Sequence, residues 1–163
     1  DIAFGPNGDI FVTDGYGNNR VMKFDRNGKF LSKWGVAGDS PGEFNLPHSI
    51  VIDSKNRVIV GDRENDRIQV FNLDGKRLDV WPGFAPYGIA LDSTGRIFVA
   101  DGRANQVIRL NSKGRPDLRL GSKGPAIGQF NLPHMLAISD DGSIIVAEVG
   151  GERFQEFRSI RTK

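Results

Sequence analysis

The chain has 163 residues, of which 26 % are charged and 38 % hydrophobic, so it is too apolar for a disordered chain and too mixed for a fibrous one. Lys and Arg number 22 against 20 Asp and Glu, with no basic run, which argues against nucleic acid as a partner. No stretch is long and apolar enough for a membrane span, and the absence of cysteine excludes disulfides, thiolate metal sites and cysteine nucleophiles. The 21 glycines, without a glycine-rich linker, indicate many tight turns between short strands.

One pattern occurs four times along the chain. Each copy has an apolar run that ends on an acidic residue, then a polar turn, then an alternating run that ends on a large apolar residue. The acidic residues are about 40 to 48 positions apart, which is typical of one propeller blade per repeat. In chain order they are Asp14, Asp62, Asp101 and Glu148. We expect each to accept hydrogen bonds from backbone N–H groups of the following turn, or to pair with a neighbouring arginine.

The runs within each repeat predict short strands. In the second repeat residues 50–52, 58–62 and 67–71 are apolar or alternating, and Asn56 and Gly75 lie in turns between such runs. A last short strand, residues 30–34 in the first repeat, closes the unit. No window has a sustained 3.6-residue apolar period, so no long helix is expected. The prediction is an all-β propeller region over residues 1–163, with blades at about 1–35, 44–82, 85–121 and 130–158.

The ends of the repeats suggest that the ring is not closed by these four blades alone. The first repeat begins inside its first strand at residues 1–4, and the last ends near its third strand at Phe157. We therefore expect part of a larger propeller, or a unit that completes itself by self-association through exposed blade faces. A solenoid is the weaker alternative, because these hairpins meander instead of coiling.

The two histidines, His48 and His134, each end a copy of the same five-residue segment, Phe-Asn-Leu-Pro-His. Each precedes the first strand of its repeat, the second and the fourth, and Tyr87 holds the matching place in the third. In a six-fold ring, alternate blades are about 120° apart and their first strands line the central channel. Three such histidines would bind Zn²⁺ with an open fourth position, and two are present here. The alternative is that each histidine caps a turn or stacks in the channel.

Two loops that follow second strands carry further candidate residues. Tyr16 lies between Gly15 and Gly17, which allow a sharp turn that exposes the phenol. The phenol could act as a base or an oxyanion donor beside a metal or a cation, or it could be an ordinary surface tyrosine. In the equivalent loop of the next repeat, Arg63 could bind a carboxylate through two hydrogen bonds, or it could form a salt bridge with an acidic neighbour such as Glu64.

The sequence resembles the NHL repeat family and, more narrowly, bacterial relatives of peptidyl-α-hydroxyglycine α-amidating lyases. The resemblance covers essentially the whole chain, in the order of the family's motifs. The stretches that carry it are Asp-Gly-Tyr-Gly-Asn-Asn-Arg at 14–20, Leu-Pro-His-Ser at 46–49, Asp-Arg-Glu-Asn-Asp-Arg-Ile-Gln-Val-Phe at 62–71 and Leu-Pro-His at 132–134.

The resemblance implies a six-bladed propeller with Zn²⁺ held on its axis by three histidines. It further implies cleavage of a peptidyl-α-hydroxyglycine to a peptide amide and glyoxylate. By this resemblance His48 and His134 match two zinc ligands, Tyr16 matches the proton acceptor, and Arg63 matches an active-site arginine. The family's first metal-binding histidine and a further arginine fall upstream of Asp1, so the chain by itself is not expected to be a competent lyase.

Two departures concern the third metal-binding histidine of the family. Leu132 occupies the position of a methionine that, in the animal enzymes, is close to this histidine. Met135 occupies the position of an acidic calcium ligand that, in the family, follows this histidine. The resemblance therefore supports a structural calcium ion only weakly.

The alternative function is a non-enzymatic NHL propeller that serves as a scaffold for a protein or peptide ligand. A third interpretation is an isolated propeller fragment that self-associates. The expected partners are accordingly a peptide substrate or a protein ligand, with no nucleic acid and no membrane. By resemblance alone, an extracytoplasmic or secreted location is expected.

Overall fold

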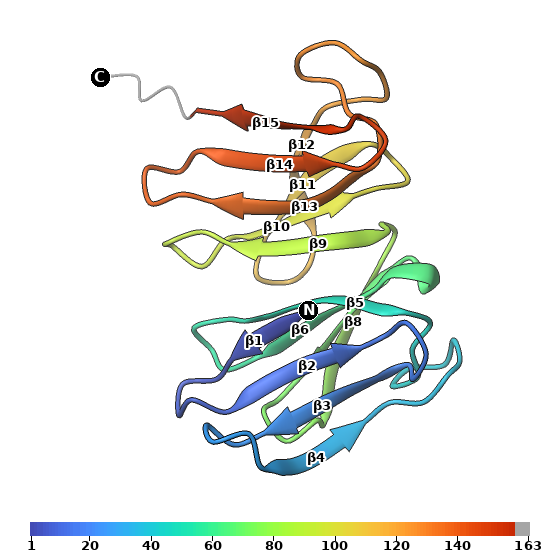
Figure 1. Cartoon of the computed structure of the whole chain (residues 1–163), viewed down its shortest axis with the longest axis vertical. Coiled ribbons are helices and arrows are strands. Elements are labelled where there is room, and N and C mark those ends of the chain that lie inside the picture. The colour runs from blue at the N-terminus through green and yellow to red at the C-terminus, as the bar shows by residue number, and fades with distance from the viewer. Residues whose placement is uncertain (159–163) are drawn as a thin grey trace. The chain divides into compact units, whose positions relative to one another are not determined.

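The computed structural model describes residues 1–158, and these residues form four antiparallel sheets (Figure 1). The first sheet contains β1 (Ile2–Phe4), β2 (Ile10–Asp14), β3 (Arg20–Phe24) and β4 (Phe30–Trp34). The second contains β5 (Pro47–Ile52), β6 (Val58–Asp62), β7 (Arg67–Phe71) and β8 (Arg77–Pro82). The third contains β9 (Pro86–Leu91), β10 (Ile97–Asp101), β11 (Gln106–Leu110) and β12 (Pro116–Leu120). The last has three strands, β13 (Pro133–Ile138), β14 (Ile144–Glu148) and β15 (Arg153–Phe157).

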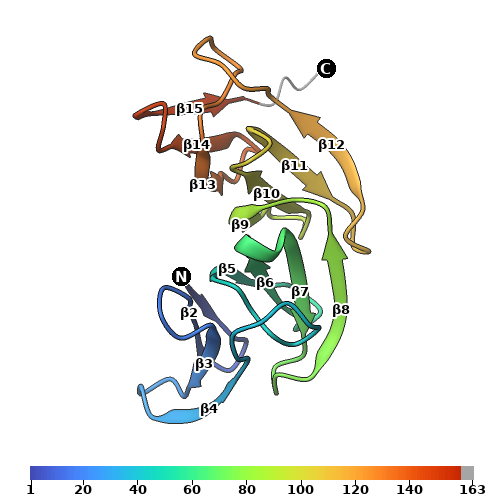
Figure 2. The same ribbon diagram turned by 90° about the vertical axis from the view of Figure 1, so that its right-hand side faces the viewer.

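Every sheet is a meander in which neighbours along the chain pair with each other (Figure 2). The one helical element in the described residues is a single 3₁₀ turn, η1 (Arg63–Asn65). The prediction of an all-β fold of propeller blades without a long helix is therefore confirmed. Within residues 1–158 no helix has the length and apolar character needed to cross a membrane.

The chain divides into two compact units, Asp1–Pro86 and Tyr87–Lys163, and each is described by itself. The first unit holds the first two sheets, and the second unit holds the last two, apart from Pro86 at the start of β9.

Short side-chain hydrogen bonds set the hairpin turns. Between β3 and β4, Asp25 Oδ1 accepts the backbone N–H groups of Asn27 and Lys29 at 2.8 and 2.9 Å. Asn72 and Asn111 do the same in the next two sheets. Asp and Asn favour such turns because a side-chain oxygen can replace a backbone carbonyl as acceptor. The turn residues in the sequence therefore locate the strand ends correctly.

Each unit has its own apolar core between its two sheets. In the first unit the core consists of residues from β1 to β3 packed on Phe44 and the second sheet; its buried members are Ala3, Phe11, Val21, Phe44, Ile50, Val58, Val60 and Phe71. In the second unit the corresponding members are Phe98, Ala100, Val107, Phe130, Leu136 and Val146. A fully buried aromatic or branched side chain contributes about 1.5–3 kcal/mol, so these clusters hold the sheets face to face within each unit.

Gly35 is a glycine for which the core leaves no room for a side chain. Its φ is +92°, and a Cβ there would lie 2.4 Å from Cδ2 of Phe44, a fully buried ring. Gly42 has a similar φ of +98°, but a Cβ there would meet open space. We expect Gly35→Ala to lower the free energy of unfolding by clearly more than Gly42→Ala, because only the first change adds a steric clash to the backbone strain. Urea unfolding of both variants tests this, and equal losses would contradict it.

Candidate functional site

The acidic residues that end the second strands of the second and last sheets anchor the loop that precedes the first strand of the same sheet. Asp62 accepts hydrogen bonds from Arg67 Nε at 2.7 Å and from the backbone N–H of Asn45 at 2.7 Å. Glu148 accepts the equivalent bonds from Arg153 Nε at 2.8 Å and from the N–H of Asn131 at 2.7 Å. Burial would raise the pKa of Glu148, but Arg153 and the other donors hold it below its usual value. The predicted anchoring role of these acids is confirmed.

The anchored loops lead into the two Leu-Pro-His segments. Leu46 and Leu132 have φ values of 60° and 55°, in the left-handed region that a branched side chain rarely adopts. The N–H of Leu46 donates to Asn19 Oδ1 at 2.8 Å, and the N–H of Leu132 donates to Asn105 Oδ1 at 2.9 Å. A non-glycine residue in this region costs about 1–3 kcal/mol and persists where its surroundings enforce it. The asparagine of the preceding sheet thus fixes the entry of each histidine.

In the first unit, three of the predicted site residues meet. Tyr16 Oη lies 3.2 Å from His48 Nε2, with the two rings edge to face at 5.8 Å between centroids. Arg63 Nη1 donates to the same Oη at 3.3 Å, and its guanidinium lies 5.7 Å from the centroid of the Tyr16 ring. Tyr16 is 78 % exposed, so the phenol is open to a ligand. The cluster combines one phenol, one imidazole and one guanidinium.

Arg63 has a carboxylate, that of Glu64, next to its guanidinium. Its Nε donates to Glu64 Oε1 at 2.7 Å, so the predicted salt bridge with Glu64 and a contact to the tyrosine exist together. Burial opposes the charge of Arg63, but hydrogen bonds with Tyr16 and Glu64 outweigh it and raise the pKa of the guanidinium. Arg63 therefore places a positive charge beside the Tyr16 oxygen.

The backbone brings Tyr16 close to His48 through a glycine. A Cβ on Gly15 would lie 2.2 Å from the carbonyl oxygen of Pro47, so only glycine allows the Tyr16 loop to approach the His48 strand this closely. Gly17, on the other side of the tyrosine, has no atom within 4 Å of such a Cβ. The two flanking glycines thus have different roles, and the first is required by the geometry of the site.

In the second unit His134 contacts an aromatic residue that the sequence did not mark as functional. Its ring lies edge to face with Tyr87, with 5.4 Å between centroids and an interplanar angle of 68°. A Cβ on Gly102 would lie 2.5 Å from Cδ2 of the Tyr87 ring, so glycine makes room for the tyrosine there. The signal in the sequence was the occurrence of Tyr87 at the place of the two histidines.

The described residues bring Tyr16, Arg63 and His48 together, whereas His134 lies in the other unit. Among residues 1–158 there is no group of three or more His, Cys, Asp or Glu side chains that could hold a metal ion. One imidazole in each unit is an incomplete donor set for zinc, which takes three protein ligands in catalytic sites. The expected convergence of the two imidazoles stays a prediction.

Comparison with known proteins gives the family of the fold. A family described as a 6-bladed beta-propeller matches residues 5–84. A probable peptidyl-alpha-hydroxyglycine alpha-amidating lyase of Caenorhabditis elegans is 33 % identical over 97 % of the chain. Human NHL repeat-containing protein 3 is 36 % identical over 92 % of the chain. The chain is a β-propeller segment that is similar to NHL repeat proteins.

The relatives are longer than this propeller segment. It spans 48 % of the nematode lyase, 46 % of the human NHL protein and 20 % of a peptidyl-glycine alpha-amidating monooxygenase B of Xenopus laevis to which it is 34 % identical. Among solved structures, a streptogramin B lyase superposes with a TM-score of 0.74 at 22 % identity, covering 99 % of the segment and 54 % of that chain. At this identity the likeness concerns the fold alone.

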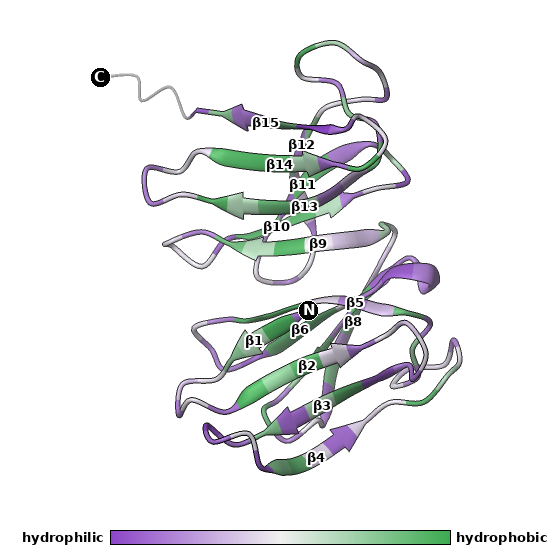
Figure 3. Cartoon of the chain, viewed as in Figure 1, coloured by the Kyte–Doolittle hydropathy of each residue, from purple (hydrophilic) through white to green (hydrophobic). Residues whose placement is uncertain are grey.

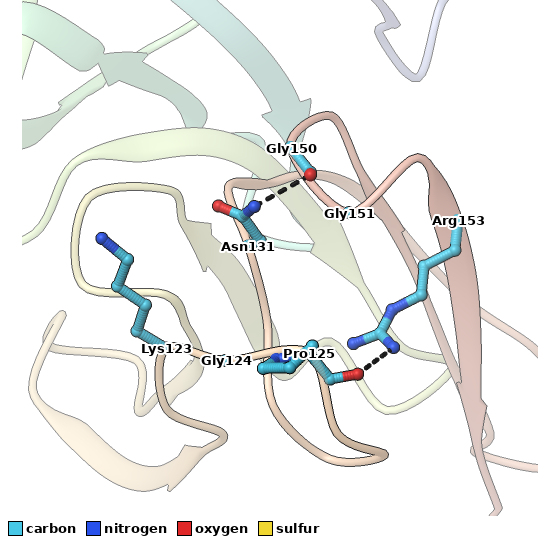
Figure 4. Close-up of a pocket in the computed structure, with 7 residues that line it drawn as sticks. All are labelled: Lys123, Gly124, Pro125, Asn131, Gly150, Gly151 and Arg153. Carbon is cyan, nitrogen blue, oxygen red and sulfur yellow. Dashed lines mark hydrogen bonds between the residues drawn. The ribbon is translucent and has the colours of Figure 1, made fainter.

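The propeller segment also has a cavity of about 390 Å³ in the second unit, beside the last sheet (Figure 4). It lies between the loop at Lys123 to Pro125 and the turn at Gly150 and Gly151, with Arg153 and Asn131 on its walls. Asn131 Nδ2 donates to the carbonyl of Gly150 at 2.8 Å, and Arg153 Nη1 donates to the carbonyl of Pro125 at 2.6 Å. These bonds hold the walls of the cavity, and none of the predicted site residues lines it.

Proposed function

We propose that this propeller segment contributes part of a lyase site that cleaves peptidyl-α-hydroxyglycine to a peptide amide and glyoxylate. The observation that carries the proposal is the cluster of Tyr16, His48 and Arg63 around one phenol oxygen. The sequence similarity to the nematode lyase supports the same substrate class.

The substrate has two features that match the cluster. Its terminal carboxylate is the partner that a guanidinium binds through two parallel hydrogen bonds, which makes Arg63 the carboxylate-binding residue. Its hydroxyl is on the carbon next to that carboxylate. Because Arg63 Nη1 is 3.3 Å from Tyr16 Oη, a carboxylate bound to Arg63 would bring the hydroxyl close to the phenol.

The reaction then requires one proton to move from oxygen to nitrogen. Tyr16, as phenolate, takes the proton of the substrate hydroxyl. The electron pair left on that oxygen forms the second C–O bond of the glyoxylate aldehyde, and the C–N bond breaks with its electrons going to the amide nitrogen. The departing amide nitrogen takes a proton, which the tyrosine can return, so no atom is left over. Arg63 and His48 stabilise the phenolate when His48 Nε2 carries the proton and donates it to the Tyr16 oxygen.

Zinc enters the proposal only through the family resemblance, by which His48 and His134 each match one of its three histidine ligands. Bound zinc would act as a Lewis acid toward the substrate oxygen. Since the described residues do not complete its ligand set, no step above uses it.

The carboxylate-binding role of Arg63 is tested by affinity. A peptide ending in α-hydroxyglycine is expected to bind the chain more tightly than the same peptide ending in an amide, and Arg63→Gln should remove the difference. The loss should be about tenfold to a hundredfold, because a hydrogen bond to a charged group contributes about 1.5–3 kcal/mol. Arg119→Gln, an exposed arginine outside the cluster, is the control. Equal affinity for both peptides, or an unchanged preference in Arg63→Gln, would contradict the proposal.

Metal binding separates the lyase proposal from a scaffold function. We expect the chain to bind added zinc weakly, so that after gel filtration it retains well below a full equivalent, and His48→Ala and His134→Ala each to lower the remainder. Atomic absorption on the three proteins measures this. If neither variant differs from the parent, the two histidines are not ligands and the scaffold function is favoured.

A further inference from the structure

The cavity of about 390 Å³ in the second unit has a counterpart of about 430 Å³ in the first unit. Each lies where the loop before a sheet's first strand meets the turn after its second strand. Figure 3 shows β13 and β14 as largely hydrophobic, and the second cavity lies beyond their ends, among polar groups of the backbone and side chains. Five wall positions are equivalent in the two repeats: Ala37, Gly38, Asp39, Asn45 and Asn65 correspond to Lys123, Gly124, Pro125, Asn131 and Gly151.

The same framework builds both cavities. Gly38 and Gly124 each have a φ of +155°, and the N–H of each donates to the carbonyl of a buried phenylalanine at 3.0 Å. Behind each loop an arginine, Arg67 or Arg153, pairs with the acidic anchor and donates to three loop carbonyls. The residues that line the first cavity all precede β7. A cavity of this kind therefore needs only the loop, the turn and the anchored arginine.

An asparagine bridges the two walls of the first cavity, and the second cavity has no such bridge. Asn65 Nδ2 donates to the carbonyl oxygen of Gly38 at 2.9 Å and so ties the turn to the loop. Gly151 takes the place of Asn65, and without a side chain it cannot donate to the carbonyl of Gly124 in this way. A Cβ on Gly151 would lie 2.6 Å from Glu148 Oε2, so the longer acidic anchor favours glycine there. The Gly124 carbonyl is thus an acceptor on the wall of the second cavity.

The charge on the walls differs between the two cavities. Asp39 puts a carboxylate on the wall of the first cavity, and Pro125 takes its position in the second. Lys123, in place of an alanine, puts an exposed ammonium group on the wall of the second cavity. Arg153 lies on the opposite side (Figure 4), and its charge is balanced by Glu148 at 2.8 Å. Lys123 therefore supplies the excess positive charge, which favours an anionic ligand in the second cavity only.

We propose that the cavity of the second unit binds a small organic carboxylate that also carries a hydrogen-bond donor. The carboxylate pairs with Lys123 Nζ, and the donor, a hydroxyl or an amide N–H, binds the carbonyl of Gly124 where Asn65 binds that of Gly38. The ring of Pro125 and the stem of Lys123 contact the apolar part of the ligand. One water molecule takes about 30 Å³ of the liquid, so the cavity suits a ligand of about a dozen non-hydrogen atoms.

Amide chemical shifts of the whole chain during titration with N-acetylleucine test the proposal, because this probe has a carboxylate, an amide N–H and the required size. We expect saturable shifts at Gly124, Gly150 and Gly151 with a Kd of about 1 mM, the range for a ligand of this size. The equivalent Gly38 in the first unit should not shift, which gives an internal control. N-acetylleucinamide, which lacks the charge, should bind at least about tenfold more weakly. Equal shifts at Gly38 and Gly124, equal binding of the amide, or no saturable shift at Gly124 would overturn the proposal.

Variants at the exposed wall positions test which groups bind the probe. Lys123→Ala copies the residue of the first cavity and should weaken N-acetylleucine at least about tenfold, and Pro125→Asp, which copies Asp39, should abolish binding. Lys113→Ala, at an exposed lysine in the turn between β11 and β12, is the control and should bind like the parent. Unchanged binding in Lys123→Ala, or an equal loss in Lys113→Ala, would overturn the proposal. The amide spectrum of each variant confirms that the fold is retained.

The carboxylate site is independent of the lyase proposal, since none of Tyr16, His48 and Arg63 lines the cavity. Arg63→Gln should therefore leave the shifts at Gly124 and Gly150 unchanged. If Arg63→Gln removed them, the probe would be bound at the Tyr16 cluster, and the proposed cavity site would be wrong while the role of Arg63 would stand.

Discussion

Replacement of Tyr16 by phenylalanine is expected to lower the rate of glyoxylate release by about 10²–10⁴-fold, which is the usual contribution of a positioned general base. Phenylalanine keeps the ring and its edge contact with His48 and removes only the oxygen that lies 3.2 Å from Nε2 and 3.3 Å from Arg63 Nη1. The assay follows glyoxylate release from an N-acyl-α-hydroxyglycine with zinc present.

The kinetic parameters distinguish a proton acceptor from a residue that only shapes the site. Loss of the base should lower kcat with little change in KM, whereas Arg63→Gln should raise KM because it removes carboxylate binding. Were Tyr16→Phe to raise KM alone, the phenol would be a binding group and the proton acceptor would lie elsewhere. An unchanged kcat would remove Tyr16 from the mechanism.

The strands and the acidic anchors could be predicted from the sequence because their causes are local. A continuous apolar run forms β6 and an alternating run forms β7. Asp25 or Asn72 defines a turn by accepting N–H groups two and four residues later. Asp62 and Glu148 each pair with an arginine five positions further on. Such contacts within one repeat recur along the chain, so the repeat itself makes them visible.

The site depends on contacts between repeats, which a single sequence shows only as coincidences. Tyr16 and His48 are 32 positions apart and belong to different sheets, so their contact follows from packing. The left-handed Leu46 and Leu132 were also not predicted, since leucine rarely adopts that conformation. The sequence does contain a signal for this conformation: an asparagine precedes each leucine by 27 positions and accepts its backbone N–H. The contact of Tyr87 with His134 likewise could not be predicted, because it depends on the room that Gly102 leaves and on the neighbouring sheet.

Removal of the Asp62 carboxylate is expected to cost about 3–5 kcal/mol of the free energy of unfolding, the usual result of breaking one side of a buried ion pair. Asp62 is 0 % exposed and accepts hydrogen bonds from Arg67, Asn65, Gln69 and the backbone of Asn45. In Asp62→Ala these donors lose their acceptor. Asp14 is the matched control, because it ends β2 as Asp62 ends β6 and pairs with Arg20 at 2.8 Å. Its side chain is 32 % exposed, so Asp14→Ala should cost about 0–1 kcal/mol.

Comparing Asp62→Ala with Asp14→Ala separates the effect of burial on stability from the effect of the ion pair, because both acids pair with an arginine. Arg67 also donates to the carbonyls of Asp39, Ser40 and Glu43, so its guanidinium holds the loop before β5 while Asp62 holds the guanidinium. Asp62→Ala should therefore loosen that loop as well as lower stability, and amide hydrogen exchange at Ser40 and Glu43 should rise with it. Equal stability losses in Asp14→Ala and Asp62→Ala would mean that pairing, and not exclusion of water, determines the contribution of the acidic anchors.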